Sequence, residues 1–324
     1  MTQTHSDRPR RIAFLVVPDF SMVGFLCALA VFRNANQIAG DNAYELSVVS
    51  IDGEPVTASA GITVAPDGGI PPELTPDLVF VCSGNNPAER YSKQLGGWLR
   101  RVSRQGTALG AISTGADLLA RAGLLTRHRC TIYWEQAAAF AEAFPEIELT
   151  DHIYEIDRDR FTCGGGTSAI DLCLRIVAQD LGEEIAAAIS ATFVLDRVRN
   201  AEEPQRRAES AHPSLGGGMP RKLATAIAAM EANIEEPLRL AAVAETAGLG
   251  ERHLTRLMRE HLDASPSAFY LRLRLTRARQ LLLQTSMSAQ EVAIACGFRS
   301  AAHFSSAYRR QFGLAPRQER QRQS

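Results

Sequence analysis

The sequence lacks the features that would place it in a membrane, outside the cell or around a metal ion. No apolar run approaches the roughly 20 residues that a helix needs to span a bilayer. The polar start, residues 1–11, has no signal-peptide cleavage pattern. Its six cysteines are scattered without the paired spacing of metal ligands. We therefore expect a cytoplasmic protein with reduced thiols, no membrane contact, no metal and no cofactor.

The sequence does contain a short motif that occurs twice in its last third. Val243–Leu249 and Val292–Phe298 each lead into a second amphipathic segment, Arg252–Met258 and Ala302–Tyr308. The copies lie 49 residues apart before the glycine and 50 apart after it, so the second turn is one residue longer. A helix, a tight glycine turn and a second helix form the helix-turn-helix plan, whose second helix enters the DNA major groove. We therefore expect double-stranded DNA as a partner.

Charge is divided unevenly between the two parts of the chain. The whole chain has a net charge of −1, but residues 1–205 carry 17 basic and 26 acidic groups, whereas residues 206–324 carry 18 and 10. The two parts therefore have net charges of −9 and +8. A compact domain at +8 has the electrostatic character of a phosphate binder. The acidic part should repel DNA and so keep the basic part facing it.

Helical phase separates a core stripe from an outward face in the second helix of each motif. The outward residues, which we expect to contact DNA, are Arg252, Thr255 and Arg256 in the first motif and Ala301, Ala302, Ser305, Ser306 and Arg309 in the second. Arginine can read guanine through two parallel hydrogen bonds, whereas alanine can only touch a thymine methyl group. The first of these helices should therefore carry more of the sequence information.

The first 200 residues alternate strand and helix signals. Arg11–Val17 and Ala108–Ile112 are continuous apolar strands, and helices are expected over Met22–Ile38 and Gly115–Gly123. This pattern predicts a mainly parallel sheet covered by helices on both faces. Ligands of such sheets bind at the carboxyl ends of the strands.

The most informative position in this part is the segment Gly110–Ala116. An apolar strand stops at Ser113, and small residues let a helix start at once, which resembles a nucleophile elbow. We expect a concave site for a small polar metabolite here, with Ser113, Thr114, Tyr133 and Trp134 as its ligand-binding residues. Two alternatives stay open: Ser113 only fits a tight turn, and Trp134 belongs to the core.

Three stretches of this part carry a family resemblance: Ala111–Leu125, Cys130–Glu135 and Phe161–Asp171. They resemble the class I glutamine amidotransferase-like domain (the PfpI/ThiJ superfamily), in the GlxA-type version that is fused to AraC-type regulators. The resemblance covers nearly all of residues 10–200 and implies a flavodoxin-like α/β parallel-sheet sandwich. It also implies an effector that contains nitrogen, such as an amino acid, a quaternary amine or a carnitine-like compound.

The sequence departs from the enzymes of that superfamily at the positions that carry their chemistry. They place a cysteine at the elbow and usually a histidine downstream in a Thr-x-His-Trp word, where this sequence has Ser113 and Tyr133. The early helix around Phe25–Phe32 also lacks their acidic residue. A phenol, whose pKa is ordinarily about 10, is a poor base for activating a serine at neutral pH. Of the other bases, His128 and His152 lie in polar segments, so we expect no catalytic residues.

The last part of the chain resembles the AraC family over its whole length. The matching words are Arg272–Leu282, Val292–Phe298 and His303–Pro316. The resemblance implies an all-α domain with two helix-turn-helix motifs in a transcription regulator, and most members of the family are activators.

These resemblances divide the chain into three parts. We expect an amidotransferase-like ligand-sensing domain over residues 10–200, a Pro- and Gly-rich linker over residues 201–218 and a double helix-turn-helix DNA-binding domain over residues 219–324. We also expect a homodimer, because a sensor has to act on paired DNA sites. The apolar-striped helices at 167–181 and 183–198 are either its contact face or cover for the sheet.

Three functions are compatible with the sequence. The first is a sequence-specific transcription regulator, an activator that responds to a small nitrogen-containing metabolite. The second is a PfpI-type hydrolase or amidase that uses Ser113, with DNA binding secondary. The third is a DNA-binding scaffold with a vestigial pocket. The pair of Ser113 and Tyr133 argues against the second.

Overall fold

A computed structural model describes residues 8–40, 42–70, 75–205, 220–285 and 287–321. The chain divides into two compact units, Met1–Gln205 and Arg206–Ser324. Each unit has its own core and is described by itself.

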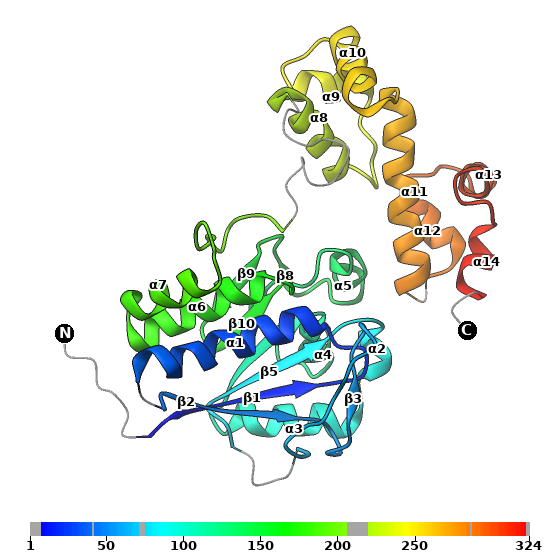
Figure 1. The fold of residues 1–324 in the computed structure, drawn as a ribbon. Helices are drawn as coiled ribbons and strands as arrows, with labels where there is room; N and C mark the ends of the chain where they lie inside the picture. The colour runs from blue at the N-terminus through cyan, green and yellow to red at the C-terminus, as the bar shows by residue number, and fades with distance from the viewer. Residues whose placement is uncertain (1–7, 41, 71–74, 206–219, 286, 322–324) are drawn as a thin grey trace. The chain divides into compact units, whose positions relative to one another are not determined.

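The first unit is built on a six-stranded sheet with the strand order β2-β1-β5-β6-β10-β9 (Figure 1). Every neighbouring pair is parallel except β9 and β10, which pair antiparallel at one edge. The strands are β1 Arg10–Val16, β2 Tyr44–Val49, β5 Leu78–Ser83, β6 Ala108–Ser113, β9 Tyr154–Asp157 and β10 Arg160–Cys163. Short two-residue strands lie outside this sheet: β3 Val56–Thr57, β4 Thr63–Val64, β7 Arg129–Cys130 and β8 Glu148–Leu149.

Helices cover both faces of the sheet, as the continuous apolar strands predicted. Phe14 and Phe80 point into one core with α1, α6 and α7, whereas Leu15 and Val81 point into the other with α3, α4 and α5. Successive residues of a strand face opposite sides, so a strand buried on both sides must be apolar throughout. The helices are α1 Met22–Ala39, α2 Pro87–Arg90, α3 Lys93–Arg104, α4 Gly115–Arg121, α5 Ala137–Ala143, α6 Ser168–Leu181 and α7 Glu183–Thr192.

Helix α1 is the one helix in the described ranges that is long and apolar enough, by length and composition, to cross a membrane. Its sequence is not one uninterrupted apolar run, because Arg33, Asn34 and Asn36 lie among the apolar residues. In the structure α1 packs on α6 and α7, and Phe25 and Phe32 are buried in the core beneath it.

The first unit extends beyond residue 200, where the sequence analysis placed the start of the linker. Pro204 pairs with His152 in an antiparallel bridge, and the Gln205 backbone N–H donates to the Asp151 carbonyl at 2.9 Å. Composition identified the turn-forming residues of this segment but could not show that its backbone pairs with the sheet edge. Residues 201–205 therefore belong to the first unit. Residues 206–218 of the expected linker lie outside the described ranges.

The second unit is all helical. Helices α9 and α10 form the first helix-turn-helix motif, α12 and α13 form the second, and α11 joins them (Figure 1). The helices are α8 Arg221–Ala232, α9 Leu240–Thr246, α10 Glu251–Leu262, α11 Pro266–Gln284, α12 Ala289–Ala295, α13 Ala301–Phe312 and α14 Pro316–Gln321.

The two copies of the repeated motif also share one pattern of side-chain burial. Over their first ten residues α10 and α13 have the same succession of exposed, half-buried and buried side chains at an offset of 50 residues. Leu254 and Phe304 are buried at one matched position, and Met258 and Tyr308 at another. The two helices therefore present matched outward faces.

The turn of the second motif contacts the loop that leads into the first motif. Gly248 and Gly297 occupy the same place in the two turns, with φ angles of 61° and 71° that favour glycine. A Cβ atom on Gly297 would lie 2.6 Å from the Ile234 carbonyl oxygen and 2.7 Å from Pro237 Cδ, both in the loop between α8 and α9. At Gly248 the nearest such atom, Lys222 Nζ, is 3.9 Å away.

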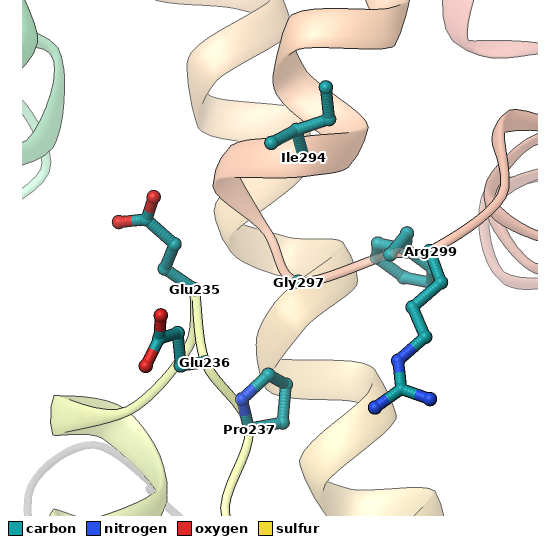
Figure 2. A pocket seen from close by; sticks show the side chains of 7 residues that line it. Glu235, Glu236, Pro237, Ile294, Gly297 and Arg299 are labelled. Atoms are coloured by element: carbon teal, nitrogen blue, oxygen red, sulfur yellow. The ribbon is translucent and has the colours of Figure 1, made fainter.

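An arginine of α11 holds this junction from the other side. Arg274 donates to the Cys296 carbonyl at 2.8 Å and to the Gly297 carbonyl at 2.6 Å, and its guanidinium lies 4.2 Å from the centre of the Phe298 ring. A groove of about 510 Å³ opens beside the contact, between the loop at Glu235–Pro237 and the segment from Ile294 to Arg299 (Figure 2). The second motif is therefore attached to the rest of the unit by the α8–α9 loop and by Arg274, as well as by the chain connection through α11.

The matched glycines give a direct test of this contact. Both Gly248→Ala and Gly297→Ala place a side chain at positive φ, which should cost about 1 kcal/mol each. We expect Gly297→Ala to cost a further 1–3 kcal/mol or so, because the added methyl group overlaps two backbone segments. Urea unfolding of the full chain, with amide exchange in α12 as the local readout, measures both changes. Equal losses in the two variants would show that the junction at Gly297 can yield.

Candidate ligand site and DNA-contacting surface

Ser113 ends β6 in a strained conformation. Its φ is 62°, its side chain is 6% exposed, and α4 begins two residues later. A positive φ is uncommon for a residue other than glycine and is frequent at functional sites. Close backbone packing holds the turn: a Cβ on Gly115 would lie 2.0 Å from the Val81 carbonyl oxygen, and one on Gly165 would lie 2.7 Å from Ser113 Cβ.

The other expected ligand residues lie beside this turn in sequence or in space, but they differ in whether their polar groups are already hydrogen-bonded. Tyr133 donates its backbone N–H to the Ser113 carbonyl at 3.3 Å, and the rings of Tyr133 and Trp134 are 5.6 Å apart, both half-buried. The Thr114 hydroxyl donates to the Gly84 carbonyl at 2.6 Å and is 2% exposed. The structure thus brings Ser113 and Tyr133 together, while the Thr114 hydroxyl is already used to join two strand ends.

The bases that could activate Ser113 are engaged elsewhere. Across the described ranges the Ser113 hydroxyl has no hydrogen-bond partner. His128 Nδ1 lies 3.2 Å from Asp157, and His152 Nδ1 lies 2.6 Å from Glu155. A serine nucleophile needs a base within hydrogen-bond reach.

A buried cysteine lies close to the elbow but has the wrong protonation state for chemistry. Burial raises the pKa of the Cys163 thiol to about 11, even though the backbone N–H groups of Gly165 and Ser113 and the Ser168 hydroxyl favour its thiolate. At neutral pH the group is therefore an uncharged thiol, and only a thiolate acts as a nucleophile.

One polar residue of this region was missed by the sequence analysis. The Gln205 side chain accepts a hydrogen bond from the Trp134 backbone N–H at 3.0 Å, and its amide nitrogen lies 2.8 Å from both Thr131 Oγ1 and the Ile132 carbonyl. A lone glutamine in a stretch read as linker gives no signal in sequence, because its partners are more than 50 positions away.

On α10 the side chains expected to contact DNA differ in their exposure to solvent and in the bonds that they already make within the protein. Arg252 and Arg256 are exposed, and Arg256 forms an ion pair with Glu260 one turn further on, at 2.8 Å. Thr255 is half-buried, and its hydroxyl donates to the Glu251 carbonyl at 2.8 Å. The two arginines therefore present the donors of this face, one of them already paired with a carboxylate.

On α13 the outward face is almost free of charge over its first two turns. Ala301, Ala302, Ser306 and Arg309 are exposed, and Ser305 is half-buried. Arginine enters this face only in the last turn of the helix. The two matched faces thus offer DNA different chemistry: guanidinium groups on α10, and methyl and hydroxyl groups on α13.

Comparison with known proteins identifies both parts of the chain. The family model of the DJ-1/PfpI family matches residues 10–179, and a helix-turn-helix domain model matches residues 243–322. The chain is 43% identical to the HTH-type transcriptional regulator GbdR of Pseudomonas aeruginosa, over 97% of this chain and 85% of that protein. It is 37% identical to the HTH-type transcriptional regulator GlxA of Rhizobium meliloti, over 97% and 96% of the two chains.

A solved structure agrees with these relatives. The crystal structure of an AraC family transcriptional regulator from Pseudomonas putida is 28% identical to this chain, with a TM-score of 0.52, and covers 57% of this chain and 100% of its own. A ThiJ/PfpI family protein from Pseudomonas syringae, at 21% identity, has a TM-score of 0.52 and shares the fold.

The different states of the two neighbouring hydroxyls predict different effects on stability. Thr114→Val should destabilise the first unit by roughly 1–3 kcal/mol, because the Gly84 carbonyl loses its buried partner. Ser113→Ala should change stability by less than about 0.5 kcal/mol, because no hydrogen bond is lost. Both tryptophans, Trp98 and Trp134, lie in the first unit, so urea unfolding followed by tryptophan fluorescence reports on this unit alone. Equal losses in both variants would mean that the Ser113 hydroxyl also stabilises the turn.

Proposed function

This chain belongs to the family of HTH-type transcriptional regulators that join a DJ-1/PfpI domain to an AraC-type helix-turn-helix domain, and from that membership we propose a ligand-responsive activator. The single observation that supports the sensing role is the Ser113 turn, where backbone strain is retained although the Ser113 hydroxyl has no hydrogen-bond partner among the described residues. Such strain persists only where the surroundings hold it, and it clusters at functional sites.

The proposed effector is a small metabolite that contains a charged nitrogen. The backbone of Tyr133 bonds to Ser113, whose hydroxyl has no partner among the described residues, and the half-buried rings of Tyr133 and Trp134 lie 5.6 Å apart. Aromatic faces attract ammonium and quaternary ammonium groups, and a hydroxyl can bind the carboxylate of the same molecule. Amino acids, trimethylated amino acids and carnitine-like compounds carry both groups.

The proposal includes no catalytic step. The carboxylates Asp157 and Glu155 hold His128 and His152, and the thiol nearest to the elbow is neutral. A PfpI-type hydrolase that used Ser113 would need a base to take the hydroxyl proton. Binding without turnover is what these groups can provide.

DNA contact is proposed through the outward faces of α10 and α13. Arg252 and Arg256 lie one turn apart on α10 and can enter one groove together. On α13, Ala301, Ala302 and Ser306 would make close apolar and hydroxyl contacts, and Arg309 would contact a phosphate. The half-buried Thr255 on α10 and Ser305 on α13 would lie at the margins of the two faces. We place the protein in the cytoplasm with its DNA, as a homodimer on paired sites.

We expect Arg256→Ala to weaken binding to the preferred DNA site by roughly 1–3 kcal/mol and to relax the preference at one base pair. Ser306→Ala, at the matched position of α13, should weaken binding much less. Glu260→Gln is the control for the ion pair: it frees Arg256 and removes a negative charge, so affinity should hold or rise. Selection from a random DNA library with each variant measures the preferences. A larger loss of preference in Ser306→Ala would make α13 the main reading helix.

The effector proposal is tested by thermal unfolding of the full chain with trimethylglycine, carnitine and arginine, followed by tryptophan fluorescence. A compound present at 100 times its Kd should stabilise the protein by about 2.7 kcal/mol. Ser113→Ala should weaken the binding of that compound about tenfold while DNA binding stays unchanged, because one hydrogen bond to a charged group is lost. Hydrolysis of esters or amides that disappears in Ser113→Ala would show instead that the domain is an enzyme.

A further inference from the structure

Gln205 is the last described residue before the segment that joins the two units, and its side chain is inserted into the first unit. Its Oε1 accepts from the Trp134 backbone N–H at 3.0 Å. Three acceptors surround its Nε2: Thr131 Oγ1 at 2.8 Å, the Ile132 carbonyl at 2.8 Å and the His152 carbonyl at 3.1 Å. An amide nitrogen has two hydrogens, so two of these acceptors are satisfied at a time.

The backbone on both sides of this side chain is also held. The Ile153 N–H donates to the Glu203 carbonyl and the Gln205 N–H donates to the Asp151 carbonyl, each at 2.9 Å. The Glu203 carboxylate forms an ion pair with Arg197. Residues 203–205 thus pair with residues 151–153 through one antiparallel bridge, and the Gln205 side-chain amide is the last attachment point of this segment.

A first connection runs from this amide to the elbow through two consecutive residues. Tyr133 donates its backbone N–H to the Ser113 carbonyl at 3.3 Å, and the next N–H, that of Trp134, donates to Gln205. The peptide between these two residues is rigid and planar. A shift of the elbow carbonyl therefore changes the position of the donor on which Gln205 depends.

A second connection runs through another pair of consecutive residues. A Cβ on Gly165 would lie 2.7 Å from Ser113 Cβ, and a Cβ on Gly164 would lie 2.2 Å from Gln205 Oε1. The backbone of this pair is therefore packed directly between the elbow and the glutamine. In each of the two pairs, one residue touches Ser113 and the other touches Gln205.

We propose that Gln205 is a latch that couples the elbow site to the start of the interdomain segment. A ligand that fixes the elbow also fixes the two pairs of residues next to it, and so favours the seated position of Gln205. Coupling between two sites is reciprocal, so the seated glutamine favours the ligand in turn. The ligand part of this inference rests on the proposed function, whereas the coupling of Ser113 to Gln205 does not.

Arg206 and Arg207 follow the latch directly, which makes trypsin a probe of its state. To cut after either residue the protease must draw Gln205 into its own cleft, so cleavage there requires the latch to open. Gln205→Ala should raise the rate of cleavage at this site in the full chain at least about tenfold, because several hydrogen bonds are lost together. Gln205→Glu should do the same, because a carboxylate cannot donate to the carbonyls of Ile132 and His152.

The latch can also be opened from the sensor side without altering Gln205. Gly164→Ala places a methyl group where the Gln205 amide lies, and the φ of Gly164 is one that alanine can adopt. Cleavage should rise as it does in Gln205→Ala, and the double variant should show no further increase. Gly97→Ala in α3 is the matched control, since its methyl group meets nothing within 4 Å. Wild-type cleavage rates in both Gly164→Ala and Gln205→Ala would overturn the latch.

Coupling to the elbow is measured with a double-mutant cycle that needs no ligand. Ser113→Asn keeps a residue that tolerates positive φ but pushes against Gly165, and it should raise cleavage several-fold. That increase should vanish when Gln205 is already alanine. Increases that simply multiply would overturn the coupling. Trimethylglycine is then added to the wild-type chain: slower cleavage supports ligand control of the latch, and an unchanged rate with an intact cycle contradicts only the proposed effector.

Discussion

The close approach of backbones at the carboxyl ends of the parallel strands is the constraint on which the first unit depends. Gly115 lies against the Val81 carbonyl, and Gly84 lies against the Asp19 carbonyl, where a Cβ would stand 2.0 Å from the oxygen in each case. The strand ends can converge only because these positions have no side chain. The convergence fixes Ser113 at positive φ, and the proposed ligand site, the neighbouring thiol and the Gln205 contact all depend on that placement.

The second unit shows a repeat whose two halves keep one core pattern and have different outward chemistry. Leu254 and Phe304 fill the same place in their motifs, yet Arg256 on α10 faces solvent where Ser306 stands on α13. Packing constrains only the buried stripe of an amphipathic helix, so the outward residues are free to differ. One fold therefore presents two outward faces of different chemistry, which we propose contact the same DNA.

The features that depend on the local pattern of apolar residues, glycines and short motifs could be predicted from the sequence. The two helix-turn-helix motifs, the parallel sheet and the elbow at Ser113 follow from periodicity, glycine placement and the words that resemble known families. Sequence reasoning did not find that Gln205 docks on the sensor, that Thr114 is used by a strand end or that Arg256 is paired with Glu260. The first two depend on partners far away in sequence. The third depends on which of several exposed rotamers an arginine adopts.

The junction at Gly297 has a consequence for the nucleic acid rather than for the protein. Because the second turn is packed against the loop at Pro237 and held by Arg274, these contacts constrain the spacing and tilt of α10 and α13, the proposed reading helices. Any mismatch with the pitch of straight B-form DNA has to be absorbed by curvature of the duplex between the two contact points. Base pairs that no side chain touches then influence affinity through the ease with which they bend.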